Sequence, residues 1–184
     1  MSKRDRRLAV VASPAARDGH GSTLLKFVRT YGEQLQDYDI HATGGTHETL
    51  VRTGLFSPDR LKAHASGEAG GIVDVANLAF SDSFGAIAML LDPTDPLAES
   101  PENLALQRAC IKSGIPQLMN YGDLAHWIEY EADLEDSVAA PTLAQPGEEI
   151  VALIAHDGKK SGMLEFFAQN VAFLTLRHKE LIAT

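Results

Sequence analysis

The chain is poor in cysteine and in aromatic residues. Among its 184 residues there is one cysteine, Cys110, and 7% of the residues are aromatic. A single cysteine can form neither an intramolecular disulfide nor a zinc cluster of several thiolates, and such a composition is typical of a reducing compartment. We therefore expect a cytoplasmic protein in which Cys110 packs in the core.

Basic side chains and long apolar runs are also scarce. The chain has 16 Lys and Arg against 25 Asp and Glu, a net charge of −9 that would repel a polyanion, so we expect no nucleic-acid partner. No apolar run approaches the ~20 residues that a membrane span requires, so we expect no membrane partner. The apolar segment 8–12, which follows a basic leader, is too short for a secretory signal and is predicted to be a buried strand.

Apolar segments with the pattern of buried strands alternate with segments of helical periodicity. We expect strands at residues 8–12, 40–43, 61–65, 86–91 and 115–119. We expect helices after the N-cap candidates Ser22 and Thr46, and over residues 72–80, 103–113 and 123–130. Strands that alternate with helices favour a parallel sheet between helical layers. The sequence therefore predicts an α/β protein with three α/β/α layers and a mostly parallel central sheet.

Residues 1–130 carry this whole alternating pattern and are expected to form one domain with a sizeable core. Residues 131–149 differ, because they are acidic, contain Pro141 and Pro146, and show no sustained periodicity. This composition indicates a linker.

In residues 150–184 the order strand, loop, helix, strand begins again. Residues 151–155 match 8–12, and residues 180–184 match 39–43. The tail is therefore predicted to be the incomplete start of a second repeat. It would either dock on the first domain or on another chain, or belong to a longer tandem protein, because a lone strand-helix-strand buries too little surface to fold by itself.

Two glycine-rich segments that follow predicted strands have the chemistry of an anion site. The first holds Thr43, Gly44, Gly45 and Thr46, and the second begins with Ser66 and Gly67. Glycines let backbone N–H groups converge on a phosphate at a helix N-terminus, and the hydroxyls add donors. Arg17, in the loop after the first strand, would add a positive charge. The alternatives are that both loops are tight turns and that Arg17 is an ordinary surface residue.

A carboxylate, Asp92, follows the most apolar predicted strand. There it could bind a ligand hydroxyl or act as an acid or base, or it could cap the turn before Pro93. Glu99 and Glu102 lie farther along, where negative charge also suits the first turn of a helix. The histidines show no spacing that places two of them on one helix face, so we expect no metal site.

These motifs, in this order, resemble the methylglyoxal synthase family, whose fold is shared by the regulatory domain of carbamoyl phosphate synthetase. The resemblance covers about residues 8–130. The matching segments are residues 8–12, Ala42-Thr43-Gly44-x-Thr46, Ser66-Gly67-x-x-Gly70-Gly71, Asp92-Pro93 and Ile115-Pro116-x-x-x-Asn120. The family's enzymes remove a proton from dihydroxyacetone phosphate and expel phosphate to give methylglyoxal. The resemblance implies this lyase chemistry without a cofactor, a small phosphorylated metabolite or inorganic phosphate as ligand, and a homo-oligomer.

Residue by residue, the resemblance carries over the phosphate site better than the catalytic set. The phosphate-site matches are Thr43, Gly44, Gly45, Thr46, Ser66 and Gly67, with Arg17 where the family has lysine. The family's catalytic aspartate corresponds to Ile72, and Asp74 lies two positions beyond it. The family's later histidine and aspartate correspond to Glu99 and Glu102, while Asp92 is unchanged.

The first-loop signature of the family is better matched in the tail. Its histidine and aspartate correspond to Ser13 and Pro14 in the first domain, whereas the tail has His156, Asp157 and Lys160. Two hypotheses follow. The chain is a divergent methylglyoxal synthase whose base is Asp92, Glu102 or Asp74, or it is a phosphate-binding module without turnover, as a regulatory domain or as the inactive half of a tandem protein.

Overall fold

The computed structural model describes residues 6–81, 84–136, 150–175 and 180–183. The chain divides into two compact units, Met1–Ala139 and Ala140–Thr184, and each is described by itself.

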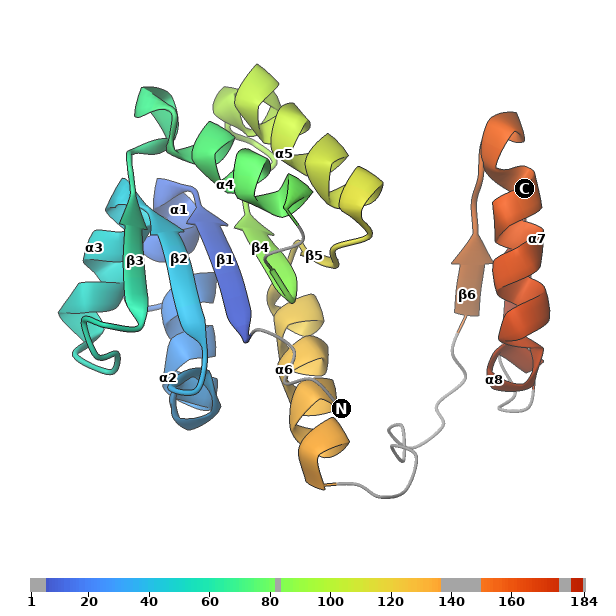
Figure 1. Cartoon of the computed structure of the whole chain (residues 1–184), viewed down its shortest axis with the longest axis horizontal. Helices are drawn as coiled ribbons and strands as arrows, with labels where there is room; N and C mark the ends of the chain where they lie inside the picture. The colour runs from blue at the N-terminus through green and yellow to red at the C-terminus, as the bar shows by residue number, and fades with distance from the viewer. Residues whose placement is uncertain (1–5, 82–83, 137–149, 176–179, 184) are drawn as a thin grey trace. The chain divides into compact units, whose positions relative to one another are not determined.

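The first unit is built on one parallel sheet with the strand order β3-β2-β1-β4-β5 (Figure 1). Its strands are β1 (Arg7–Ala12), β2 (Asp39–Thr43), β3 (Leu61–His64), β4 (Ala86–Leu90) and β5 (Gln117–Leu118). The two central strands, β1 and β4, are almost entirely buried, as expected for strands covered on both faces. The predicted parallel α/β sheet is therefore confirmed.

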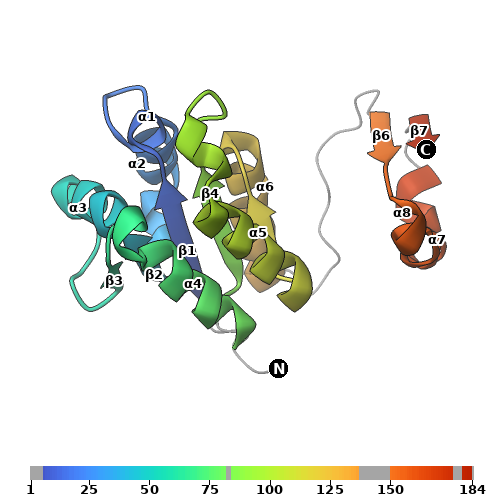
Figure 2. The ribbon, with the colours of Figure 1, turned by 90° about the horizontal axis from the view of Figure 1, so that it is seen from above.

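Helices cover both faces of this sheet (Figure 2). They are α1 (Pro14–Arg17), α2 (Thr23–Leu35), α3 (Gly44–Thr53), α4 (Gly71–Phe80), α5 (Pro101–Ser113) and α6 (Tyr121–Asp136), with short 3-10 turns η1 (Gly67–Ala69) and η2 (Pro96–Glu99). Leu8 and Val10 of β1 pack with α2, α3 and α6 on one face, and Ala9 and Val11 pack with α4 and α5 on the other. Alternate residues of one strand thus contribute to two apolar cores, one on each face of the sheet, and this gives the three-layer architecture.

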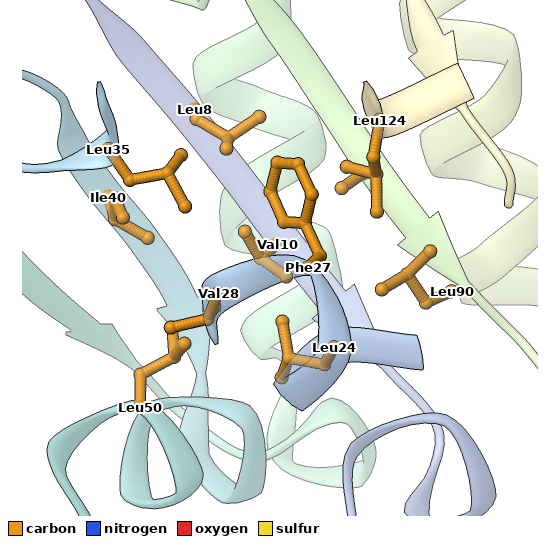
Figure 3. A pocket seen from close by; sticks show the side chains of 11 residues that line it. Leu8, Val10, Leu24, Phe27, Val28, Leu35, Ile40, Leu50, Leu90 and Leu124 are labelled. Atoms are coloured by element: carbon orange, nitrogen blue, oxygen red, sulfur yellow. The ribbon is translucent and has the colours of Figure 1, made fainter. Parts of the chain in front are cut away.

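The layer beneath α2 contains a small internal void of about 10 Å³ (Figure 3). Its lining is wholly apolar, so a water molecule would find no hydrogen-bond partner there. The residues that line it include Leu8, Val10, Leu24, Phe27, Val28, Leu35, Ile40, Leu50, Leu90 and Leu124. The void is part of the apolar core. Cys110 packs in the opposite layer, where burial raises the pKa of its thiol to about 11.

Several predicted boundaries are wrong. The helix α3 begins at Gly44 with Thr43 as its N-cap, so Thr46 lies inside the helix and does not cap it. The strand predicted at 115–119 has only two residues, Gln117–Leu118. The last helix of the unit continues to Asp136, so the first residues of the predicted linker are helical, and the rest of that segment, 137–149, lies outside the described residues.

The second unit contains β6 (Ile150–Leu153), η3 (Asp157–Lys159), α7 (Lys160–Gln169), α8 (Val171–Thr175) and β7 (Glu180–Ala183). Its two strands pair in parallel, with Val151 opposite Leu181. In the first unit Leu8 stands opposite Ile40 in the same way. None of the helices in the described ranges is long and apolar enough to cross a membrane.

Candidate functional site

A cavity of about 540 Å³ opens at the carboxyl-terminal edge of the sheet. Parallel strands all end at this edge, which is where open α/β sheets place their ligands. The segments after β1, β2, β3 and β4 contribute to the lining. Of the residues singled out in the sequence, the cavity brings together Arg17, Thr43, Gly45, Ser66, Gly67, Ile72, Asp92 and Glu102.

The guanidinium of Arg17 lies directly over the first turn of α3. A Cβ atom on Gly45 would be 2.5 Å from the Cζ of Arg17, so only glycine leaves room for this position of the side chain. The Nε of Arg17 pairs with Asp18 at 3.2 Å, and Nη1 lies 3.5 Å from the carbonyl oxygen of Ala12. Arg17 therefore lines the cavity from a short helix, α1, that the sequence pattern did not predict.

The N-terminus of α3 supplies backbone donors to the same region. Thr43 has the extended backbone of an N-cap, but its side chain makes no capping hydrogen bond. The N–H of Gly44 donates to the carbonyl oxygen of Ala65 at 3.1 Å. Gly44 does not line the cavity, whereas Gly45 does. The first turn of a helix carries N–H groups without intrahelical partners, and these suit an anion.

Thr46 is completely buried and does not reach the cavity. Its Oγ1 accepts a hydrogen bond from the Ala12 N–H at 3.2 Å and lies 3.4 Å from the Ala12 carbonyl oxygen. The prediction that Thr46 binds phosphate directly is therefore wrong, and the hydroxyl instead joins α3 to the end of β1.

The loop that begins at Ser66 lies beside the first turn of α3 and also lines the cavity. It turns through η1 and reverses at Gly70, which has a positive φ of 95°. A Cβ on Gly71 would overlap the carbonyl oxygen of Ala65, so glycine is required for the backbone to pass this point. The turn leaves Ser66 and Gly67 beside the cavity.

Asp92 caps the turn that follows β4 and also lies at the cavity. It lines the cavity, and its Oδ1 accepts hydrogen bonds from the Oγ1 of Thr94 at 2.7 Å and the N–H of Thr94 at 2.8 Å. These hydrogen bonds lower the pKa of Asp92 from its ordinary value, because they stabilise the charged form. Asp92 is therefore an ionised acceptor at neutral pH.

Ile72 is 8% exposed and lines the cavity, at the position where the resemblance would place the catalytic aspartate. Asp74 lies two residues along α4, is exposed and does not line the cavity, so the structure does not bring this candidate base to the site. Glu99 also does not line the cavity, whereas Glu102 does.

Five polar residues that line the cavity were not among the predicted site residues, namely Ser13, Glu68, Asp95, Ser100 and Asn103. Asp95 and Ser100 are N-caps, of η2 and α5 respectively. Asn103 is only 5% exposed, and its Nδ2 donates to the carbonyl oxygen of Leu97 at 2.9 Å. A polar residue on the apolar side of a predicted helix was the signal that could have found it.

A histidine pair lies outside the cavity on the neighbouring strands β2 and β3. The Nδ1 of His41 lies 3.0 Å from the Nε2 of His64. Burial lowers the pKa of His41 to about 4, and the nearby His64 adds to this effect. In the described part of the chain, no group of three or more His, Cys, Asp or Glu side chains is arranged to hold a metal ion.

In the second unit, His156, Asp157 and Lys160 lie at the connection between β6 and α7. The Nδ1 of His156 accepts a hydrogen bond from the Gly158 N–H at 3.2 Å. The Nζ of Lys160 pairs with Asp157 at 2.9 Å. All three residues are exposed.

Comparison with known proteins finds methylglyoxal synthases. The chain is 27% identical over 117 residues to a methylglyoxal synthase of Clostridium botulinum, an alignment that covers 63% of this chain and 92% of the relative. It is 29% identical over 111 residues to a methylglyoxal synthase of Bacillus subtilis, with 58% and 76% covered. No protein-family model matches the chain.

A solved structure shares the fold. The crystal structure of a methylglyoxal synthase from Elizabethkingia anophelis aligns with a TM-score of 0.56 and 19% identity, over 67% of this chain and 76% of the other. The similarity in sequence to methylglyoxal synthases and the three-layer fold thus agree with each other.

Proposed function

We propose that the first unit binds a phosphorylated metabolite or inorganic phosphate in this cavity, with the phosphate between Arg17, the first turn of α3 and the Ser66–Gly67 turn. The observation that carries the proposal is the position of the Arg17 guanidinium over Gly45, where a positive charge meets the N-terminus of α3 at the cavity wall. Phosphate binds well to such an arrangement, because hydrogen bonds that involve charged groups are stronger than neutral ones.

Binding without turnover is the activity that the residues favour. In the methylglyoxal synthases that the chain resembles, the base is an aspartate, and Ile72 at the matching position cannot accept a proton. The chain would then serve as a regulatory domain or as the inactive half of a tandem protein. In either case the proposed donors are the guanidinium of Arg17 and the backbone N–H groups of Gly45 and Gly67, none of which belongs to the Ile72 side chain, although that side chain packs against Gly67.

A divergent lyase is the second candidate, and it is favoured by the presence of Asp92 and Glu102 in the same cavity. One of these carboxylates would take a proton from the hydroxymethyl carbon of dihydroxyacetone phosphate. The resulting enediolate would expel phosphate as the carbon–oxygen bond breaks, and the product would rearrange to methylglyoxal. Removal of such a proton by a positioned base contributes typically 10² to 10⁴ in rate.

Residues 150–184 are proposed to be the start of a second copy of the fold. The strand register supports this, because the matched residues Val151 and Leu181 pair as Leu8 and Ile40 do. Lys160 lies as many residues beyond Ala155 as Arg17 lies beyond Ala12, the last residues of the two matched segments. Residues 1–130 hold every member of both core clusters, so deletion of residues 140–184 should leave cooperative unfolding intact. A loss of cooperativity would contradict the proposed division.

The resemblance also carries the proposals of a homo-oligomer and a cytoplasmic location. Sedimentation of the purified chain over a range of concentrations tests the first, and a single monomeric species throughout would contradict it.

Calorimetric titration with inorganic phosphate and with glycerol 3-phosphate tests the proposed binding. We expect Arg17→Ala to weaken binding by about tenfold, with a smaller dependence on salt than the unchanged protein. Arg60→Ala is a matched control, because Arg60 pairs with Asp39 at the other end of the sheet. This variant should bind phosphate as tightly as the unchanged protein. Absence of heat at millimolar ligand, or equal affinity in Arg17→Ala, would contradict the proposal.

A further inference from the structure

One residue that lines the cavity carries a buried hydrogen-bond acceptor that the described residues do not satisfy. This acceptor is the Oδ1 of Asn103, for which no donor is found in the part of the chain that the structure describes. The residue is 5% exposed and lines the cavity, and its Nδ2 is fixed on the carbonyl oxygen of Leu97. Buried acceptors in native proteins are normally paired, so this oxygen points to a donor supplied from outside the chain.

The charges of the cavity identify the kind of donor. Four carboxylates line it, Glu68, Asp92, Asp95 and Glu102, against one basic residue, Arg17. None of the four forms an ion pair with another residue in the described ranges, and Arg17 is itself paired with Asp18. A dianionic phosphate that entered alone would add to this negative field.

Resting on the proposed phosphate site, we propose that the ligand is a phosphate ester with a protonated amine at its other end, and that Asn103 and the carboxylates bind the amine. An ammonium group has three donors and no acceptor, so it can satisfy the Oδ1 of Asn103 and a carboxylate such as Glu102 at once. A hydroxyl has one donor and no charge, and so it offsets none of the excess negative charge.

A short turn is hydrogen-bonded to the Asn103 amide. The Oδ1 atom is closed to solvent, and the segment that covers the amide includes Leu97, whose carbonyl oxygen accepts from Nδ2. This segment is the short turn η2, held at its start by the hydrogen bond from Leu97 N–H to Asp95 Oδ1 at 2.9 Å. Contact with the ligand therefore requires a small shift of η2, which is a single turn at the edge of the cavity.

The experiment compares phosphate esters that differ only in the amine. Glucosamine 6-phosphate is paired with glucose 6-phosphate, and 3-aminopropyl phosphate with 3-hydroxypropyl phosphate, in calorimetric titrations of the full chain beside inorganic phosphate. We expect at least one amine to bind about tenfold or more tightly than its hydroxyl counterpart. The ratio within each pair is the readout, because a general loss of folding or of phosphate binding affects both members equally.

Three variants assign the preference to named groups. Asn103→Leu and Glu102→Gln should each reduce the ratio severalfold without weakening the binding of inorganic phosphate. Asn103→Asp retains an acceptor and should keep or increase the ratio. If Asn103→Leu does not fold, a reduced ratio in Asn103→Asp would contradict the proposed contact. Equal binding of amine and hydroxyl esters by a protein that binds phosphate would overturn this inference and leave the proposed function standing. An amine preference unaltered in Asn103→Leu and Glu102→Gln would also overturn it, whereas failure of every phosphate to bind would overturn both proposals.

Discussion

The hydroxyl of Thr46 accepts a hydrogen bond from the Ala12 N–H at 3.2 Å and thereby joins the first turn of α3 to the end of β1. Residues of both regions line the cavity, Gly45 in α3 and Arg17 in α1, the short helix that follows β1. The hydrogen bond is buried and connects residues that are far apart in the chain. It therefore positions two parts of the proposed phosphate site without contacting the ligand.

Thr46→Val should lower the free energy of unfolding by about 1–3 kcal/mol, because it leaves the buried Ala12 N–H without a partner. Urea denaturation measures the change. Thr46→Ser keeps the hydroxyl and should lose clearly less stability. If Thr46→Val unfolds at the same urea concentration as the unchanged protein, the hydrogen bond has no structural role.

Gly45→Ala should weaken phosphate binding by about tenfold, because its new Cβ would occupy the space of the Arg17 guanidinium, 2.5 Å away. Stability should be unchanged or slightly higher, because alanine favours a helix over glycine by up to about 1 kcal/mol. The double variant with Arg17→Ala should bind no more weakly than Arg17→Ala alone, since both changes remove one interaction. Full additivity of the two losses would contradict this explanation.

The apolar strands could be predicted from the sequence, and the close contacts of the site could not. The run from Ala86 to Leu90 indicates a central strand because covered strands are apolar on both faces. Ser22 was predicted correctly as an N-cap, since its side chain accepts from the Leu25 N–H. Thr46 was wrongly predicted as the N-cap of α3, because glycine has a low helix propensity and Gly44 and Gly45 therefore did not look helical. In the structure the hydrogen bond between Thr46 and Ala12 outweighs the low helix propensity of these two glycines.

The candidate site shows the same division. Glycine loops after strands predicted the donor wall, since parallel strands bring their ends to one edge. That Glu102 and Asn103 line the same cavity as Asp92 depends on the path of η2, which local sequence does not specify. The contact between His41 and His64 was missed because it crosses two strands, and a search along helix faces cannot find it.

The stability of the first unit should fall as the pH is lowered from about 6.5 towards 4. The folded pKa of His41, about 4, lies below its unfolded value of 6.5, so the unfolded chain binds more protons in this interval. The contribution of neutral His41 to the free energy of unfolding is complete above pH 6.5 and is lost as the pH falls through 4. We expect the contribution to be on the order of 1 kcal/mol, because His41 is partly exposed and water screens its charge.

Urea denaturation at pH 7 and pH 5 measures this dependence, with His41→Asn as the comparison. The variant should show a smaller difference in unfolding free energy between the two pH values. The same difference in both proteins would show that His41 is not the group responsible.

Ile72→Asp should create or raise methylglyoxal formation from dihydroxyacetone phosphate, because it restores a carboxylate at the cavity wall. A base of this kind is worth about 10² to 10⁴ in rate, so the variant should exceed Ile72→Asn by at least the lower figure. The measurement is release of methylglyoxal and phosphate. High activity of the unchanged chain that is lost in Glu102→Gln would instead establish the lyase and identify its base.

The most direct test of the central claim, that the cavity holds a phosphate at the first turn of α3 and the Ser66–Gly67 turn, is a titration followed by the backbone amide signals in NMR spectra. We predict that inorganic phosphate shifts the N–H signals of Gly45 and Gly67 along one saturable curve, and that Arg17→Ala requires about tenfold more phosphate for the same shift. The contradicting result is that these two signals stay in place at millimolar phosphate, or that they move equally in the unchanged protein and in Arg17→Ala.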